Sequence, residues 1–448
     1  MSIEQPYSVE ENKQLGSEPD KISLTSPDTL SSPNSSSGEK EKKLTHTTFS
    51  AFQHRSYRLM WIGSFISNMG TWSQRVAEPW LVFNLSGSAF LLGLNGFAAE
   101  SPLLAFLLLG GVLADRTDRK KALIIAQLVQ MLSALAIMSL ALTDSLTVWL
   151  IIALSFVVGC AQSVSTPAYL SILPSLVSRE NLTNAIALNS TQFNLSRLIG
   201  PVIGGILLTS IGAAWCFGVN ALSYAAVIFV LAIIAVPKAD TQNAGEDVWK
   251  SMREGLLEVA SKKELVTLII IICSVSFFAG PLLTFLPVLA KEVLHVDAQG
   301  FSIALACFGG GAVVGALIIA SAGHIENRFR IVIGATALLG ASLIAISFSN
   351  SYLLSLVFMA IAGIAFVGCG SLANTIMQTS VSDRIRGRAV SIYALAFRGG
   401  LPLGNLVAGA LIHSFNVQLV LGLNGLALLI ILFFTYQFGY RKYVVSAV

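Results

Sequence analysis

The sequence predicts an all-α membrane protein with twelve transmembrane helices arranged as two six-helix, pseudo-symmetric halves. Of its 448 residues, 54% are hydrophobic and only 12% are charged, and the mean hydropathy is +0.74. This composition is too apolar for a water-soluble chain of this length. A helix needs about 20 apolar residues to cross the hydrocarbon core of a bilayer, and such stretches recur between short polar breaks. The expected spans are 58–84, 88–113, 121–143, 147–170, 185–211, 214–236, 266–290, 299–322, 329–349, 351–376, 389–413 and 416–440.

One long polar break and an internal repeat divide these spans six and six. In the break, Val248, Met252, Leu256 and Val259 recur at helical spacing, which predicts an amphipathic helix on the inner membrane surface. Shifting the first half by 204 positions superimposes identical residues, such as Gly111 on Gly315, Gly200 on Gly404 and Gly205 on Gly409. The expected organisation is a disordered cytoplasmic tail (1–50), a first bundle (51–236), a linker (237–265), a second bundle (266–441) and a cytoplasmic tail (442–448).

Positive charge is concentrated on one side of the predicted membrane. The first 50 residues lack the apolar segment of a secretory signal and are rich in Ser, Pro, Glu and Lys. With this tail inside the cell, the inner loops hold cations such as Arg119, Lys120 and Lys262, whereas the outer side holds only Lys291. Because cytoplasmic loops carry the excess of Lys and Arg, we expect a multi-pass protein of the cell (inner) membrane with both termini in the cytoplasm.

Composition and motifs exclude several other classes of protein. The net charge of +4 comes from short loops and gives no basic face for nucleic acid. Each of the five cysteines stands alone in an apolar segment, so neither a metal nor another cofactor is expected. The sequence has no HExxH, GxSxG or GxxxxGK[ST] motif, which argues against an enzyme or an ATP-driven pump. We expect a monomeric transporter for a small molecule; a non-transporting scaffold would have no reason to retain charge inside the membrane.

The loop between the second and third spans carries a dense cluster of charge. The segment Gly111-Val-Leu-Ala-Asp115-Arg116-Thr-Asp118-Arg119-Lys resembles the G-x-L-a-D-R-x-G-R-K signature of the major facilitator superfamily. The resemblance implies the major facilitator fold and a cytoplasmic gate, in which Asp115 meets the positive N-terminus of the eleventh span. Asp118 replaces a glycine of the pattern. It either strengthens the gate through nearby arginines or merely occupies a turn.

A second motif lies in the fifth span. The segment Gly200-Pro201-Val-Ile-Gly204-Gly205 resembles the antiporter motif of exporting members of the superfamily. Proline bends a helix by leaving a backbone carbonyl without its donor, and glycines let a partner helix approach. The alternative is generic close packing. The expected partner is the eighth span, with Gly309, Gly310, Gly311 and Gly315.

Two longer stretches are similar to one bacterial branch of this superfamily. They are RSYRLMWIGSFISNMGTWSQRVAEPWLV near the N-terminus and TPAYLSILPSLVSRENLTNAIALNS, which runs from the end of the fourth span into the fifth. The branch includes the enterobactin exporter. The resemblance covers about residues 50 to 440. It implies a proton-coupled exporter of a small organic molecule such as a siderophore, working by alternating access. The alternative is broad-specificity drug or lipid efflux.

Ionisable residues inside the membrane are costly and point to function. At 1.5 Å per residue, Glu100, Arg197 and Arg398 lie about 18, 18 and 14 Å into their spans. We expect Glu100 to carry the coupling proton, because low polarity favours the neutral carboxyl group; an ion pair with Arg197 is the alternative. Arg75 and Glu78 share one face of the first span and are expected to pair, which leaves Glu78 as the second candidate for the proton.

The midplane charges also predict the substrate. Two arginines against one carboxylate favour an anion, because a guanidinium binds a carboxylate through two hydrogen bonds. Further polar residues are expected either to line the substrate cavity beside Arg197 and Arg398 or to bridge helices. These residues are Asn68, Gln74, Gln162, Gln192, Asn194, Asn374, Gln378 and Asn405.

Overall fold

The computed structural model describes residues 49–114, 118–236, 248–321, 327–382 and 386–437. Every regular element in these ranges is a helix. The expected cytoplasmic tails lie almost wholly outside the described residues. A short helix, η1 (Ser50–Gln53), precedes the first long one.

Six long helices follow, which we call the N-terminal helices. A tight turn joins the first two. Gly87 ends the first of them with a φ of +58°, in the left-handed region that glycine enters without a steric penalty, and its N–H donates to the Phe83 carbonyl. The N-terminal helices are α2 (Arg55–Ser86), α3 (Ala89–Ala114), α4 (Arg119–Leu142), α5 (Val148–Ile172), α6 (Leu182–Ser210) and α7 (Ala213–Ile233).

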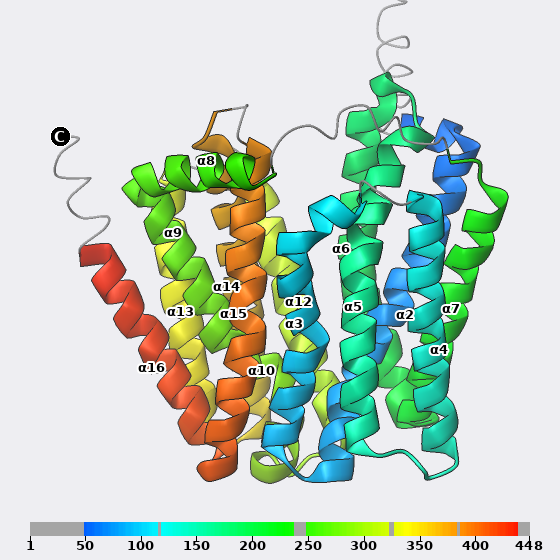
Figure 1. The fold of residues 1–448 in the computed structure, drawn as a ribbon. Helices are drawn as coiled ribbons and strands as arrows, with labels where there is room; N and C mark the ends of the chain where they lie inside the picture. Colours follow the sequence, from blue (N-terminus) through cyan, green and yellow to red (C-terminus); the bar gives the residue numbers. More distant parts are fainter. Residues whose placement is uncertain (1–48, 115–117, 237–247, 322–326, 383–385, 438–448) are drawn as a thin grey trace, which may run out of the picture. The chain divides into compact units, whose positions relative to one another are not determined.

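An amphipathic helix, α8 (Val248–Ser261), occupies the long polar break, as the sequence predicts. It buries Val259 and leaves Leu256 and Leu257 exposed. Figure 1 shows α8 lying across the ends of α9 and α15, the helices that it contacts. Just beyond α8, the Lys262 ammonium donates to the Ser380 carbonyl at 2.6 Å.

The remaining long elements form the C-terminal helices. The expected seventh span is not one regular helix, because Pro281 and Pro287 cannot donate backbone hydrogen bonds and wide turns replace the missing bonds. It consists of α9 (Lys263–Ser274), the π-turn η5 (Val275–Ala279), α10 (Pro281–Thr284), α11 (Leu286–Val288) and the π-turn η6 (Leu289–Val293). The others are α12 (Ala298–Ser321), α13 (Arg328–Phe348), α14 (Tyr352–Thr379), α15 (Arg386–Ser414) and α16 (Val417–Thr435).

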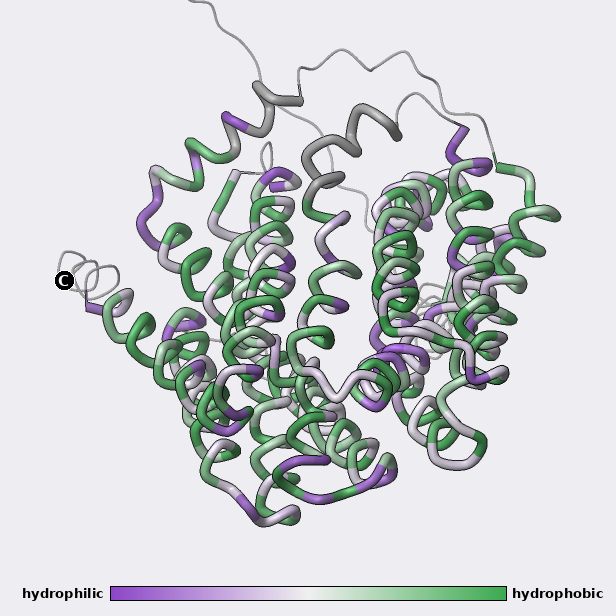
Figure 2. The backbone as a smooth tube through the Cα atoms, turned by 60° about the horizontal axis from the view of Figure 1, so that its bottom comes forward, coloured by the Kyte–Doolittle hydropathy of each residue, from purple (hydrophilic) through white to green (hydrophobic). Residues whose placement is uncertain are grey.

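Ten helices in the described part of the chain are long and apolar enough to cross a membrane. Of the other expected spans, α3 qualifies only as the shorter apolar helix Ala89–Leu104, and α2 is long but more polar. Figure 2 shows hydrophobic residues along the helices and hydrophilic residues mostly at turns and helix ends. Large apolar side chains such as Leu132, Leu222 and Leu353 are exposed on the helices, as expected where lipid is the solvent. The chain is a multi-pass membrane protein.

The most extensive contacts between the N-terminal and C-terminal helices in the described part of the chain are the crossings of α3 with α15 and of α6 with α12. At the first, a Cβ on Gly93 would collide with the Asn405 carbonyl, and one on Gly409 would lie 2.9 Å from the Ala89 carbonyl. The α3–α15 crossing therefore depends on small residues. Both crossings lie toward the end of the bundle where α2 turns into α3, which we call the α2–α3 end.

The glycines of α12 do not make the contact that the sequence predicts for them. Gly311 and Gly315 pack against the backbone of α14, and Gly309 and Gly310 have open space beside them. The partnership of the fifth and eighth spans is real, but it is made elsewhere: a Cβ on Gly205 would lie 2.9 Å from the Ser302 Cβ. The sequence predicted the correct pair of helices, α6 and α12, but the wrong face of α12 for their contact.

Candidate functional site

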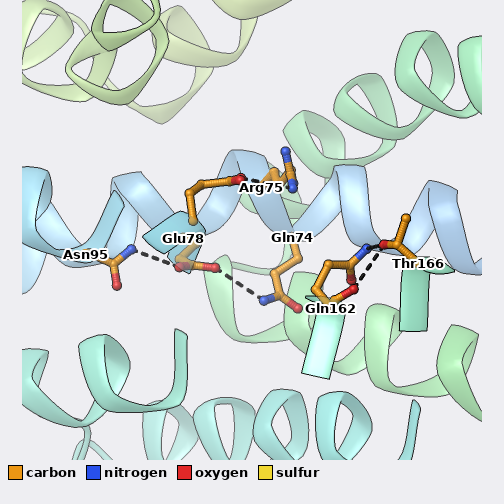
Figure 3. A network of polar contacts seen from close by, with 7 residues as sticks. Gln74, Arg75, Glu78, Asn95, Gln162 and Thr166 are labelled. Carbon is orange, nitrogen blue, oxygen red and sulfur yellow. Dashed lines mark hydrogen bonds and ion pairs between the residues drawn. The ribbon is translucent and has the colours of Figure 1, made fainter. Parts of the chain in front are cut away.

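The carboxylate of Glu78 on α2 accepts three hydrogen bonds, all from neutral donors. They come from Gln74 Nε2 at 3.3 Å, from Asn95 Nδ2 on α3 at 2.9 Å, and from Ser155 Oγ on α5 at 2.8 Å. Figure 3 shows two of them, from Gln74 and Asn95. Asn95 is almost fully buried, and its Oδ1 has no partner among the described residues. Three helices thus meet at one half-buried carboxylate.

This polar network extends from α2 into α7. The side-chain carbonyl of Gln74 accepts a 2.6 Å hydrogen bond from Asn220 Nδ2. The Asn220 Oδ1 in turn accepts from Ser223 Oγ at 3.0 Å and from Thr71 Oγ1 at 3.4 Å. Gln74, expected either to line a cavity or to bridge helices, is buried and bridges α2 and α7.

The expected ion pair between Arg75 and Glu78 is wrong. Arg75 Nη2 lies 3.5 Å from Glu100 Oε1 on α3, with the two side chains 50% and 20% exposed. The reason is that Glu78 turns toward α3 and α5, where neutral donors satisfy it, whereas Arg75 reaches across to the neighbouring helix. The expected alternative partner for Glu100, Arg197, is not its ion-pair partner in the structure either.

Two arginine side chains lie over the indole ring of Trp72, which stands one helical turn before Arg75. The Arg75 guanidinium carbon lies 5.0 Å from the centre of the indole, and that of Arg197 on α6 lies 5.7 Å from it. Phe193 meets the same ring edge to face, at 6.2 Å between centroids. The two distances from the guanidinium carbons to the indole centre fall in the range of cation–π attraction. Trp72 is not among the site residues predicted from the sequence, although its spacing of three residues from Arg75 places the two on one helix face.

Arg398 on α15 completes the charged cluster. It interacts electrostatically with Glu100 and with Arg75, and Arg197 interacts with Arg75. Arg197 and Arg398 both lie near the middle of their 29-residue helices. The cluster is made by four helices, α2, α3, α6 and α15.

Each arginine of this cluster stands four residues before a proline inside its own helix. Arg75 precedes Pro79 in α2, and the same spacing recurs in α6 and α15. In a helix the N–H of residue i+4 donates to the carbonyl of residue i, and proline has no N–H. The backbone carbonyl of each arginine therefore lacks its helical donor. The pairs are Arg75 and Pro79, Arg197 and Pro201, and Arg398 and Pro402.

Most of the other polar residues expected in the cavity bond along their own helices. Gln162 donates to Thr166, Asn194 to the Ser190 carbonyl, and Gln378 to Asn374. Asn68 on α2 is half-buried. These contacts do not join the residues to the arginine cluster. Their role in lining a substrate cavity therefore stays a prediction.

Gln192 and Asn405 are buried, at 1% and 2% exposure, and each has one side-chain atom without a partner among the described residues. Asn405 lies at the α3–α15 crossing, where its amide is 2.6 Å from a Cβ built on Gly96. It acts there as a packing residue. In the described part of the chain, no group of three His, Cys, Asp or Glu side chains could hold a metal ion.

The gate motif is described only in part. Asp115 and Arg116 lie outside the described residues, and of Gly111 the helical backbone alone is described. Asp118 caps α4: its carboxylate accepts from the backbone N–H groups of Lys120 at 3.1 Å and Lys121 at 3.3 Å. Asp118 has a φ of −61°, so no left-handed residue is needed there. Arg119 is the first residue of α4.

The cap makes a prediction for Asp118. Asp118→Ala removes both hydrogen bonds and should lower the stability of the protein by about 1 kcal/mol, whereas Asp118→Gly should cost a few tenths. Asp118→Asn keeps a capping oxygen and should behave like the wild type in both thermal unfolding and transport. If Asp118→Asn loses transport as fully as Asp118→Ala, the charge serves the gate and not the cap.

The antiporter motif lies mostly against α2. A Cβ on Gly200 would collide with the Trp72 Cβ, and one on Gly204 would lie 2.6 Å from the Ser73 carbonyl. Pro201 lies inside the unbroken α6. The motif thus sets the approach of α6 to the Trp72 segment, and only Gly205 faces α12.

A second cluster, not predicted from the sequence, joins α2 to η6 and α12 at the α2–α3 end. Lys291 in η6 donates to Asn84 Oδ1, and its ammonium lies 5.0 Å from the Trp80 ring centre and 5.9 Å from that of Phe83. Trp80 also stacks on Phe301 of α12, at 5.2 Å between centroids. We call Lys291, Trp80, Phe83 and Asn84 the Lys291 latch. Its only signal in the sequence was a single cation on the outer side.

Comparisons with known proteins identify the family. The family model for the transmembrane secretion effector matches residues 46–446. The chain is 28% identical over 351 residues to the multidrug efflux pump Tap of Mycolicibacterium fortuitum, covering 75% of this chain and 84% of Tap. It is 27% identical over 382 residues to the enterobactin exporter EntS of Escherichia coli O1:K1, covering 84% and 90%.

A solved structure shares the fold. A bacterial homologue of the human lysosomal transporter Spinster, in an inward-facing and unoccupied conformation, aligns with a TM-score of 0.67 at 15% identity, over 86% of this chain and 96% of that one. The family model spans nearly all of the described residues, including the arginine cluster and the Glu78 network. The chain therefore belongs to the transmembrane secretion effector family of major facilitator transporters, related to the branch of the enterobactin exporters, and is not an enzyme.

Proposed function

We propose that this chain is a proton-coupled exporter of a small organic anion such as a siderophore, working by alternating access in the bacterial inner membrane. In this proposal twelve spans form two six-helix halves, and both termini lie in the cytoplasm. One observation carries the proposal: Arg75 and Arg197 lie over the Trp72 ring and Arg75 pairs with Glu100, whereas the hydrogen-bond donors of Glu78 are all neutral. One site holds positive charge for an anion, and the other holds a carboxylate for a proton.

Glu78 is the better candidate for the proton. Glu100 already has a cationic partner, Arg75 at 3.5 Å, whereas Glu78 has none among its hydrogen-bond donors. The partners of Glu78 suit both forms of its carboxyl group, because the Asn95 amide and the Ser155 hydroxyl can each donate or accept. The unpartnered Asn95 Oδ1 is available to accept from the protonated form once the amide rotates. This reverses the order of preference that the sequence gives to Glu100 and Glu78.

Broad-specificity efflux is the second candidate. The chain resembles the multidrug pump Tap, at 28% identity, as closely as it resembles the enterobactin exporter, at 27%. The aromatic side chains of Trp72 and Phe193 beside the arginines would also suit apolar drugs.

Two measurements test the proposal. In reconstituted vesicles, an imposed pH gradient should drive flux that a matched gradient-free control lacks; equal flux with and without the gradient excludes proton coupling. In iron-starved cells, deleting the gene should lower siderophore secretion relative to the parent strain. Unchanged siderophore secretion together with increased drug sensitivity favours broad efflux.

A further inference from the structure

We propose that Trp72, Arg75 and Arg197 bind a planar aromatic hydroxy acid as its anion, and that Glu100 is the internal competitor of that anion for Arg75. This inference rests on the proposed export of an organic anion and names the chemical class of the substrate group. It adds Trp72 and Arg75 to the residues that the sequence predicts for the substrate site.

The Trp72 ring with its two guanidinium groups suits an aromatic anion. The guanidinium groups of Arg75 and Arg197, 5.0 and 5.7 Å from the ring centre, hold two positive charges against one aromatic surface. Indole and guanidinium planes both stack on other flat groups, and a guanidinium also binds a carboxylate in a fixed, planar geometry. A ligand that is both flat and anionic can stack on these groups and also bind the guanidinium through its carboxylate, whereas an aliphatic anion can only bind the guanidinium.

The freed backbone carbonyls favour a hydroxyl group beside the acid. Pro79 and Pro201 leave the carbonyls of Arg75 and Arg197 without a helical donor. A carbonyl without a donor is a strong acceptor. These carbonyls belong to the same two residues as the guanidinium groups. An aromatic hydroxy acid would supply a carboxylate for the guanidinium groups and a hydroxyl for a carbonyl.

Glu100 already holds the guanidinium that such an anion needs. Its ion pair with Arg75 is 3.5 Å long and half exposed on the arginine side, a geometry whose net stabilisation is small. A ligand carboxylate can replace Glu100 at low cost. Of the three arginines, Arg75 is thus the one whose partner a substrate would displace.

This competition determines whether protonation of Glu100 would raise or lower the affinity for the anion. Protonating Glu100 would release Arg75 and strengthen anion binding, so that the proton and the anion would move together. Export against an inward proton flow requires that proton and substrate exclude each other. Glu100 is therefore the anion's competitor and not the carrier of the exchanged proton, and the exchange falls to a separate carboxylate.

Equilibrium dialysis of the purified full chain in lipid nanodiscs tests the site without any transport. The probes are radiolabelled 2-hydroxybenzoate and its neutral analogue 2-hydroxybenzamide. We expect Glu100→Gln to bind 2-hydroxybenzoate more tightly, by up to about fivefold. Arg75→Gln should weaken binding about tenfold or more. Arg75→Lys and Trp72→Phe, which perturb folding less, should weaken it by smaller factors.

Glu180→Gln is the matched control, because it makes the same chemical change at an exposed residue and should leave the affinity unchanged. The proposal is overturned if the hydroxy acid and the amide bind equally, or if Glu100→Gln binds the anion no more tightly than the wild type. Either result would leave pH-driven export intact, since that property is measured by flux. Loss of pH-driven flux alongside the expected binding would refute the proposed coupling and not this site.

Discussion

Glu78→Gln is expected to abolish pH-driven transport while leaving exchange down a substrate gradient nearly intact. Glutamine has the shape of glutamate and can still bond to Asn95 and Ser155, which hold the carboxylate at 2.9 and 2.8 Å, but it cannot take up a proton. Coupling free energies between two sites typically correspond to about 5- to 150-fold effects. We therefore expect a loss of at least about fivefold in flux driven by an imposed pH gradient, measured in vesicles.

Glu100→Gln is the comparison for this experiment. It removes the partner of Arg75 and should keep the response to the pH gradient, although the substrate affinity changes. The opposite pattern, with undiminished pH-driven flux in Glu78→Gln and none in Glu100→Gln, would return the proton to Glu100.

Lys291→Gln is expected to open the α2–α3 end. The glutamine amide can still donate to Asn84, but the cation that faces Trp80 and Phe83 is lost. Cation–π contacts contribute about 0.5–2 kcal/mol, so the ratio of closed to open molecules should fall about two- to thirtyfold. Spin labels at Leu85 and Gln299, which are exposed and outside the Lys291 latch, would report this as longer distances.

Lys291→Arg provides the control, since arginine keeps the positive charge over the rings and should preserve the closed population. The labelled protein needs a background in which its five native cysteines are replaced by alanine. Identical distance distributions for Lys291→Gln and the wild type would show that the latch does not hold this end closed.

The helices followed from local sequence because their causes are local. An apolar stretch of sufficient length specifies a membrane helix without reference to its neighbours, and the expected third span, 121–143, differs from α4 by only a residue or two at each end. The amphipathic helix α8 was likewise predicted from the helical spacing of its apolar residues. The seventh span was the exception, since its two prolines redirect backbone hydrogen bonds over several turns.

The hydrogen-bond and ion-pair partners of the polar residues could not be predicted from the local sequence. Spacing on one helix favoured Arg75 with Glu78, but a side chain can also reach a neighbouring helix, and Arg75 reaches Glu100 on α3. Asp118 drew attention as a departure from a motif, and the structure gives it a local task as the cap of α4. Trp72 could not be predicted as a site residue, because an aromatic residue in an apolar span carries no signal of its own.

The sequence by itself determined the membrane class of this protein, the positions of its helices and the presence of charge at their centres, because hydrophobic length and buried charge are properties of single segments. Only the tertiary structure decided which charges meet. That choice depends on how helices cross, and glycines such as Gly93 and Gly205 set those crossings through contacts with residues hundreds or scores of positions away. The division between an arginine cluster and a neutral network around Glu78 is therefore a property of packing.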